Sequence, residues 1–173
     1  MSFGYDRLKQ TGEKGARKKT NNQWFETQDT IGYWEDFYKQ KIIFQEMVQE
    51  PSFMFDKEGT FFCLDTGRII IGENIDYLIS ILNSRLFFFA VKKFYGGGGL
   101  GALGVRMKHT FFDRFSIPIL NADRQAIFVN LVNTLINQTH NKSILIDLEN
   151  EINKQVYNIY DLTPNEIESI ESQ

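Results

Sequence analysis

Residues 74–94 of this 173-residue chain read NIDYLISILNSRLFFFAVKKF, and the helix that they predict is the element on which the expected fold is built. Its apolar residues recur at helical spacing, at Ile75, Leu78, Ile79, Leu82 and Leu86. Asn74 precedes them and is a residue type that commonly caps a helix N-terminus. We therefore predict one helix from Ile75 to about Phe94, with an apolar face that packs on a body built from the preceding residues.

The helix leads into a glycine-rich segment, YGGGGLGALG, at residues 95–104. Lys92 and Lys93 precede the glycines, and Arg106, Lys108 and His109 follow them. Glycine backbone can approach a ligand closely, and the flanking cations attract an anion. A flexible connector and a ligand-binding loop both fit this pattern.

The residues before this helix favour strands. KIIFQEMV, at Lys41–Val48, is rich in β-branched and aromatic residues, and RIIIG follows at residues 68–72. SFMFD and TFFCLD flank a turn that ends at Gly59, which predicts a hairpin. Residues 30–37 fit a loop or a short helix, and VRMKHTFFDRFSIPI resembles a strand closed by Pro118.

The residues after the glycines favour helices. Asp123 is the expected N-cap of the first helix, and the second helix carries a longer apolar stripe. Thr163 and Glu166, with Pro164 between them, predict a capping box at the start of a third helix. The two apolar stripes are Ile127, Leu131, Leu135 and Ile136, then Leu145, Leu148, Ile152, Val156 and Ile159. The expected fold class is α+β, a mixed or antiparallel β body with a packed helix at about 75–94, followed by a C-terminal helical region. The expected domains are a basic flexible lead-in (1–22), an α/β body (23–120) and a helical region packed on that body (121–173).

Composition excludes several classes of protein. Cys63 is the only cysteine, so the chain forms no internal disulfide, and its thiol is expected to act as a small hydrophobic group in a strand. His109 and His140 have no partners at metal-ligand spacing. The longest apolar run, Leu86 to Val91, is too short to cross a bilayer, so we expect a soluble, cytoplasmic protein.

Catalytic and nucleotide motifs find little support. Gly99, Gly101 and Gly104 match G-x-G-x-x-G, but that fingerprint needs a preceding strand and a following helix, and here the order is reversed. The sequence has no G-x-S-x-G or H-E-x-x-H motif. We therefore expect this chain to be non-catalytic by itself and to hold no cofactor.

Charge favours a polyanionic partner for one part of the chain. The formal net charge is −3, but residues 121–173 carry −5 and the remaining 120 residues carry +2. Between Phe88 and Arg114, five Lys or Arg side chains and one Asp give +4. Arg106 is the candidate for a guanine edge, because a guanidinium pairs with O6 and N7 together. The other candidate DNA-binding residues are suited to phosphates: Lys92, Lys93, Gly97, Gly98, Lys108 and His109.

Aromatic residues lie in the lead-in and in the start of the body. Trp24, Phe25, Tyr33, Trp34, Phe37 and Tyr38 are able to stack on bases. Core packing is the commoner role for such side chains, and it is the expectation here for the tryptophans.

The order of these segments resembles a known family. The segments follow one another as in the TaqI-like C-terminal specificity domain. In order, they are KIIFQEM, FMFDKEGTFFCLDT, DYLISILNSRLFFF, the glycine-rich segment, SIPI, ADRQAIFVNLV and EINKQVYNIYDLTPNEIESIE. The resemblance covers about Trp24 to Glu171. Its most specific pieces are ILNSRL, the junction of SIPI with the following Arg-Gln pair, and VYNIYDLTPNEIE.

The resemblance implies a target-recognition domain that reads double-stranded DNA for bacterial type II restriction-modification enzymes and N6-adenine DNA methyltransferases. Such a domain usually follows a methyltransferase domain that binds S-adenosylmethionine and is sometimes fused to an endonuclease. The Asn-Pro-Pro-aromatic motif of that catalytic domain is not in this sequence, so this chain is expected to be the C-terminal portion of a longer protein. A protein-interaction module that docks a methyltransferase or restriction subunit through the acidic helical end is the alternative.

Overall fold

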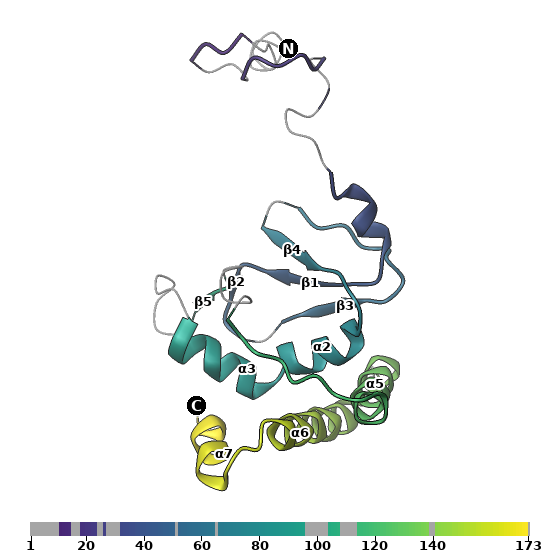
Figure 1. Cartoon of the computed structure of the whole chain (residues 1–173), viewed down its shortest axis with the longest axis vertical. Coiled ribbons are helices and arrows are strands. Elements are labelled where there is room, and N and C mark those ends of the chain that lie inside the picture. The colour runs from purple at the N-terminus through teal and green to yellow at the C-terminus, as the bar shows by residue number, and fades with distance from the viewer. Residues whose placement is uncertain are drawn as a thin grey trace. The chain divides into compact units, whose positions relative to one another are not determined.

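A helix layer lies beneath a small antiparallel sheet in the computed structural model, and further helices cover the other side of that layer (Figure 1). The structure describes residues 11–14, 18–23, 26, 32–50, 52–64, 66–95, 104–107, 114–138 and 141–172. The chain divides into two units, Met1–Asp36 and Phe37–Gln173, and the description below concerns the second. The short 3-10 helix η1 (Trp34–Tyr38) contains the boundary between the units.

Three strands form the main sheet, in the order β3-β1-β4. They are β1 (Lys41–Gln45), β3 (Met54–Asp56) and β4 (Gly67–Ile70), and both neighbouring pairs are antiparallel. Ile42 of the central strand lies opposite Phe55 on one side and Ile70 on the other. Because Ile42 is fully buried, this register turns the apolar face of the sheet toward the helices.

A second, two-stranded sheet joins distant parts of the chain. It pairs β2 (Met47–Val48) with β5 (Val105–Arg106), so that Met47 lies opposite Arg106. Glu46 separates β1 from β2 and therefore lies between the two sheets. Its N–H donates to Thr66 O at 3.4 Å, and its carbonyl accepts from Met107 N–H at 2.7 Å.

The expected hairpin across Gly59 is wrong. Residues 60–64 form no strand, and β3 pairs with β1 instead. The Asp56 carboxylate accepts hydrogen bonds from the N–H groups of Thr60 (3.1 Å) and Phe61 (2.9 Å), so these groups do not pair with a neighbouring strand. Gly59 does adopt the expected left-handed conformation, with φ of 66°.

The single helix expected over about 75–94 is divided in two. Helix α2 (Ile75–Leu82) ends at Asn83, and α3 (Arg85–Ala90) begins after Ser84 and continues as the π-helix η2 (Val91–Tyr95). The Asn83 amide bonds both backbone groups of Phe53, and Ser84 Oγ accepts from Phe87 N–H at 3.1 Å. The apolar period continues across this break, so periodicity alone did not reveal it.

Three more helices follow in the described part of the unit: α5 (Ala122–Asn137), α6 (Lys142–Ile159) and α7 (Pro164–Glu171). Helix α5 packs on α2 and α6, and α3 contacts α6 and α7. One apolar core joins Ile42 and Phe53 of the β body to Phe87, Phe128 and Val156 of the helices. The expected α+β class, with a helical C-terminal region, is confirmed.

The existence of these helices was predicted better than the residues that cap them and form their apolar stripes. Asn121, not Asp123, caps α5, and its Oδ1 accepts from Arg124 N–H at 3.0 Å. Asn74 holds the N-cap position of α2 in a left-handed conformation, but its side chain makes no capping bond. The buried stripe of α5 runs through Phe128 and Val132, whereas the expected Ile127 and Ile136 are substantially exposed. The capping box of α7 is confirmed.

Candidate nucleic-acid interface

Three of the seven predicted DNA-binding residues lie in the part of the chain that the structure describes. They are Lys92, Lys93 and Arg106, at the two ends of the glycine-rich segment. Gly97, Gly98, Lys108 and His109 lie outside the described residues. The structure therefore describes the elements that precede and follow the expected glycine loop.

Lys92 and Lys93 are exposed on η2, the π-helical continuation of α3. Lys92 Nζ lies 5.2 Å from the centroid of the Phe88 ring, and Lys93 Nζ lies 6.0 Å from that of Phe89. Both distances permit a cation–π attraction of about 0.5–1 kcal/mol at an exposed site. These contacts orient the two ammonium groups while leaving them accessible to a phosphate.

Arg106 points from β5 toward a carboxylate rather than only toward solvent. Its Nε donates to Glu46 Oε1 at 2.5 Å, and the guanidinium side chain remains 53% exposed. Glu46 also accepts from Arg68 of β4, whose Nη2 lies 3.2 Å from Glu46 Oε2. We call Glu46, Arg68 and Arg106 the Glu46 cluster; it carries two positive charges and one negative charge.

Sequence reasoning did not select Arg68 or Glu46 as site residues. Glu46 is 22 positions from Arg68 and 60 positions from Arg106, so no local motif joins these residues. The available signal was strand pairing, because Arg68 lies opposite Phe44 in the main sheet and Arg106 lies opposite Met47 in the second. Phe44 belongs to β1 and Met47 to β2, and Glu46 connects these two strands.

A cavity of about 900 Å³ opens beside the Glu46 cluster. All three cluster residues line it, and the rest of its wall is apolar, including Phe44, Phe87, Phe115, Ile70 and Ile117. Apolar walls reduce the local dielectric constant, so charges at the edge of this cavity interact more strongly than charges on an open surface. The charges of the Glu46 cluster therefore interact more strongly than those of a fully solvated ion pair.

The predicted aromatic residues fall into two groups. Trp24 and Phe25 lie outside the described residues, whereas Tyr33 and Trp34, in the first unit, are more than half exposed. The expectation of core packing is wrong for Trp34, which is 54% exposed. In the second unit, Phe37 stacks on Phe62 with ring centroids 5.2 Å apart, and Tyr38 meets the edge of the same ring.

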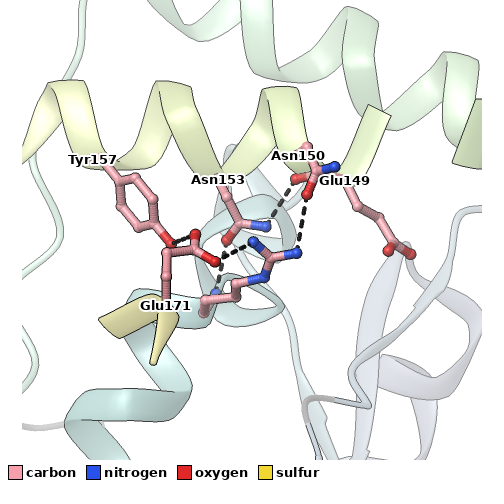
Figure 2. Close-up of polar contacts among 6 residues, drawn as sticks. Glu149, Asn150, Asn153, Tyr157 and Glu171 are labelled. Atoms are coloured by element: carbon pink, nitrogen blue, oxygen red, sulfur yellow. Dashed lines mark hydrogen bonds and ion pairs between the residues drawn. The ribbon is translucent and has the colours of Figure 1, made fainter. Parts of the chain in front are cut away.

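A polar network holds the acidic helical end against the body. The labelled side chains in Figure 2 come from α6, except Glu171, which comes from α7 and points toward Tyr157. Arg85 of α3 donates to Glu171 at 2.6 Å and to Asn150 at 2.9 Å, and Tyr157 donates to Glu171 at 2.7 Å. Burial would raise the pKa of Glu171, but these hydrogen bonds and the Arg85 charge hold its pKa below the usual value.

The described residues contain no group of three or more His, Cys, Asp and Glu side chains placed to hold a metal ion. Cys63 is a free, half-buried thiol, and residues 60–64 form no strand around it. No described helix combines the length and apolar character needed to cross a membrane.

Comparison with known proteins identifies a family. The family model of the TaqI-like C-terminal specificity domain matches residues 5–99. This match confirms the resemblance that the sequence suggested, although it begins earlier than Trp24 and ends within the glycine-rich segment. No curated protein matches the chain.

Proposed function

The chain belongs to the TaqI-like C-terminal specificity domain family, and from this premise we propose that it recognises a specific sequence in double-stranded DNA for a restriction-modification methyltransferase. The observation that carries the proposal is the pair of cationic elements around the glycine-rich segment. Lys92 and Lys93 are exposed before it, and Arg106 is half exposed after it. The family match ends at residue 99. In the sequence, this position lies between two lysines suited to phosphates and an arginine suited to a base edge.

The two kinds of cation have different expected roles. A lysine ammonium is a compact charge that binds phosphate without regard to sequence, whereas a guanidinium has the planar geometry that matches guanine O6 and N7. Lys92 and Lys93 therefore supply affinity, and Arg106 supplies discrimination. Gly97, Gly98, Lys108 and His109 remain proposed contacts of the same surface.

Binding of the full chain to labelled duplexes, followed by fluorescence anisotropy over a range of salt concentrations, tests the proposal. A pool of duplexes with a randomised central segment supplies both the affinity and, after selection and sequencing, the preferred sequence. We expect enrichment of one sequence and a linear decrease of log affinity with log salt. Absence of both effects would contradict the proposal.

We further propose that the chain itself performs no methyl transfer and that S-adenosylmethionine binds a separate catalytic domain or subunit. The sequence has no catalytic motif, and the glycine pattern has the wrong neighbouring elements for a nucleotide site. Isothermal titration of the chain with S-adenosylmethionine should give no binding heat. Saturable binding would instead assign a nucleotide-dependent function to the glycine-rich segment.

A second candidate function is docking of a methyltransferase or restriction subunit on the helical end. The observation that favours it is a set of substantially exposed isoleucines on α5 and α6: Ile127, Ile136, Ile144 and Ile146. These helices also carry the acidic part of the chain. Sedimentation of the chain with a methyltransferase subunit, for the original protein and for Ile144→Asp, tests this candidate. A complex that forms without DNA and is weakened by the substitution would support it.

A further inference from the structure

We propose that Glu46 and Arg68 are positioning residues that hold Arg106 in the orientation needed to read a guanine in the major groove. This inference rests on the proposed DNA recognition and deepens it. It assigns a role to two residues outside the glycine-rich segment and specifies the base that the cluster takes. The evidence is the way in which one carboxylate divides its two oxygens between two arginines.

Glu46 engages Arg106 through Nε alone. The contact of 2.5 Å joins Nε to Oε1, so both terminal nitrogens of Arg106 lie outside this ion pair. A guanine presents two acceptors, O6 and N7, on one edge, and the two terminal nitrogens of a guanidinium match them. Holding Nε thus fixes the plane of the guanidinium without occupying the edge that would meet the base.

Arg68 is held in a different way. Its Nη2 donates to Glu46 Oε2 at 3.2 Å, and its Nη1 donates to Gly67 O at 3.2 Å. Its terminal edge is therefore already engaged by two acceptors of the protein. Arg68 is suited to hold the Glu46 carboxylate in its orientation, and it is less suited than Arg106 to meet a base.

The backbone of Glu46 fixes the starting point of this arrangement. Its N–H and carbonyl bond to Thr66 and Met107, on the chain segments that lead to β4 and away from β5. The carboxylate consequently extends from a residue anchored to both sheets. Only 22% of the Glu46 side chain is exposed, compared with 53% for Arg106, so the acid lies behind the arginine that it orients.

The charge balance favours a base edge over a phosphate as the ligand of Arg106. A carboxylate at 2.5 Å offsets much of the guanidinium charge and repels a phosphate. The O6 and N7 atoms of guanine are neutral acceptors and do not suffer this repulsion. Among the described residues, Lys92 and Lys93 lie over aromatic rings rather than beside a carboxylate, so they remain the better phosphate ligands.

The test compares base preference among variants of the full chain, with the randomised duplex pool as the probe. We expect the original protein to enrich guanine at one position, and Arg106→Ala to lose that preference. Glu46→Gln and Arg68→Ala should keep Arg106 but reduce the guanine preference about ten-fold, because its guanidinium is no longer oriented. Glu149→Gln and Arg124→Ala, which alter exposed residues of α6 and α5, serve as matched controls and should retain the original preference.

A second measurement separates positioning from a general loss of structure. A duplex with 7-deazaguanine at the enriched position lacks the N7 acceptor, so the original protein should bind it about ten-fold more weakly than guanine. Glu46→Gln should show little difference between the two duplexes while keeping its thermal transition. Unchanged base preference in Glu46→Gln and Arg68→Ala, or no guanine that depends on Arg106, would overturn the inference. Failure of the original protein to enrich any sequence would overturn the proposed DNA recognition as well.

Discussion

Lys41 and Asp56 form an ion pair inside the protein, where both side chains are shielded almost completely from solvent. Lys41 begins β1 and Asp56 ends β3, directly opposite each other in the sheet. Lys41 Nζ also donates to Phe37 O, while Asp56 accepts from the backbone of Thr60 and Phe61. The pair therefore connects η1, the sheet edge and the segment that replaces the expected hairpin.

Breaking this pair should destabilise the protein strongly. Lys41→Met or Asp56→Leu leaves an unpartnered charge in a buried position, so we expect each to lower the free energy of unfolding by about 3–5 kcal/mol. The double substitution should cost less than the sum of the two, because it removes both charges. Urea unfolding followed by circular dichroism measures all three variants. Additive single-variant effects would contradict the coupling.

Asp56 also predicts a dependence of stability on pH. Burial would raise its pKa, but hydrogen bonds from Lys41, Phe61 and Thr60, with the Lys41 charge, hold the pKa below its usual value of 3.8. A lowered carboxyl pKa stabilises the folded state above pH 3.8, and this contribution disappears as the pH falls through the folded-state pKa. Urea midpoints measured from pH 6 to pH 2 should therefore fall less steeply for Asp56→Asn than for the original protein.

Tyr77 predicts that the free energy of unfolding depends on pH in the alkaline range. Its hydroxyl donates to Pro118 O at 3.0 Å, and burial raises the pKa of this buried side chain to about 12. The neutral phenol stabilises the folded state fully below pH 10, and that stabilisation is lost as the pH rises from 10 toward 12. Tyr77→Phe should remove this part of the loss. Equal slopes of unfolding free energy above pH 10 in both proteins would show that Tyr77 does not contribute.

Gly59 should resist substitution because two constraints coincide there. Its φ is 66°, and an added Cβ would lie 2.2 Å from Tyr38 O. Gly59→Ala should therefore lower the free energy of unfolding by more than about 1 kcal/mol. Gly32→Ala, where an added Cβ meets no atom within 4 Å, is the matched control. Thermal denaturation of the two variants compares them directly.

Lys92 and Lys93 should affect DNA binding without affecting base choice. Replacing both with Ala removes two phosphate-directed charges, so the slope of log affinity against log salt should become less negative by about 2. The sequence selected from the randomised pool should stay the same. A shift in the selected sequence would instead assign base contacts to these lysines.

The sequence predicted most helices because their signals are local. The Thr163–Glu166 capping box and the apolar period of α6 each lie within a few turns, and both are confirmed. The division at Asn83 was not predictable in this way, because it depends on the Phe53 backbone 30 residues away. The hairpin failed for a related reason, since Lys41 pairs with Asp56 from a separate strand.

The candidate site shows the same limit. Charge clustering identified Lys92, Lys93 and Arg106, which are close in sequence to the glycines. It could not identify Glu46 and Arg68, because only the pairing of β1 with β4 and of β2 with β5 brings their side chains to Arg106. An acidic residue also lowers the local net charge, so a search for positive clusters selects against it.

The position of Glu46 between the two sheets has a consequence for how such a domain diversifies. Its backbone bonds require only that the incoming and outgoing segments offer a carbonyl and an N–H, which any residue except proline supplies. The exposed Thr66 side chain is therefore exchangeable without moving the joint, whereas the Met107 side chain is buried in the apolar core. Under the DNA recognition proposed above, a lineage that acquires a new specificity can replace the glycine-rich segment as a cassette while inheriting the same frame.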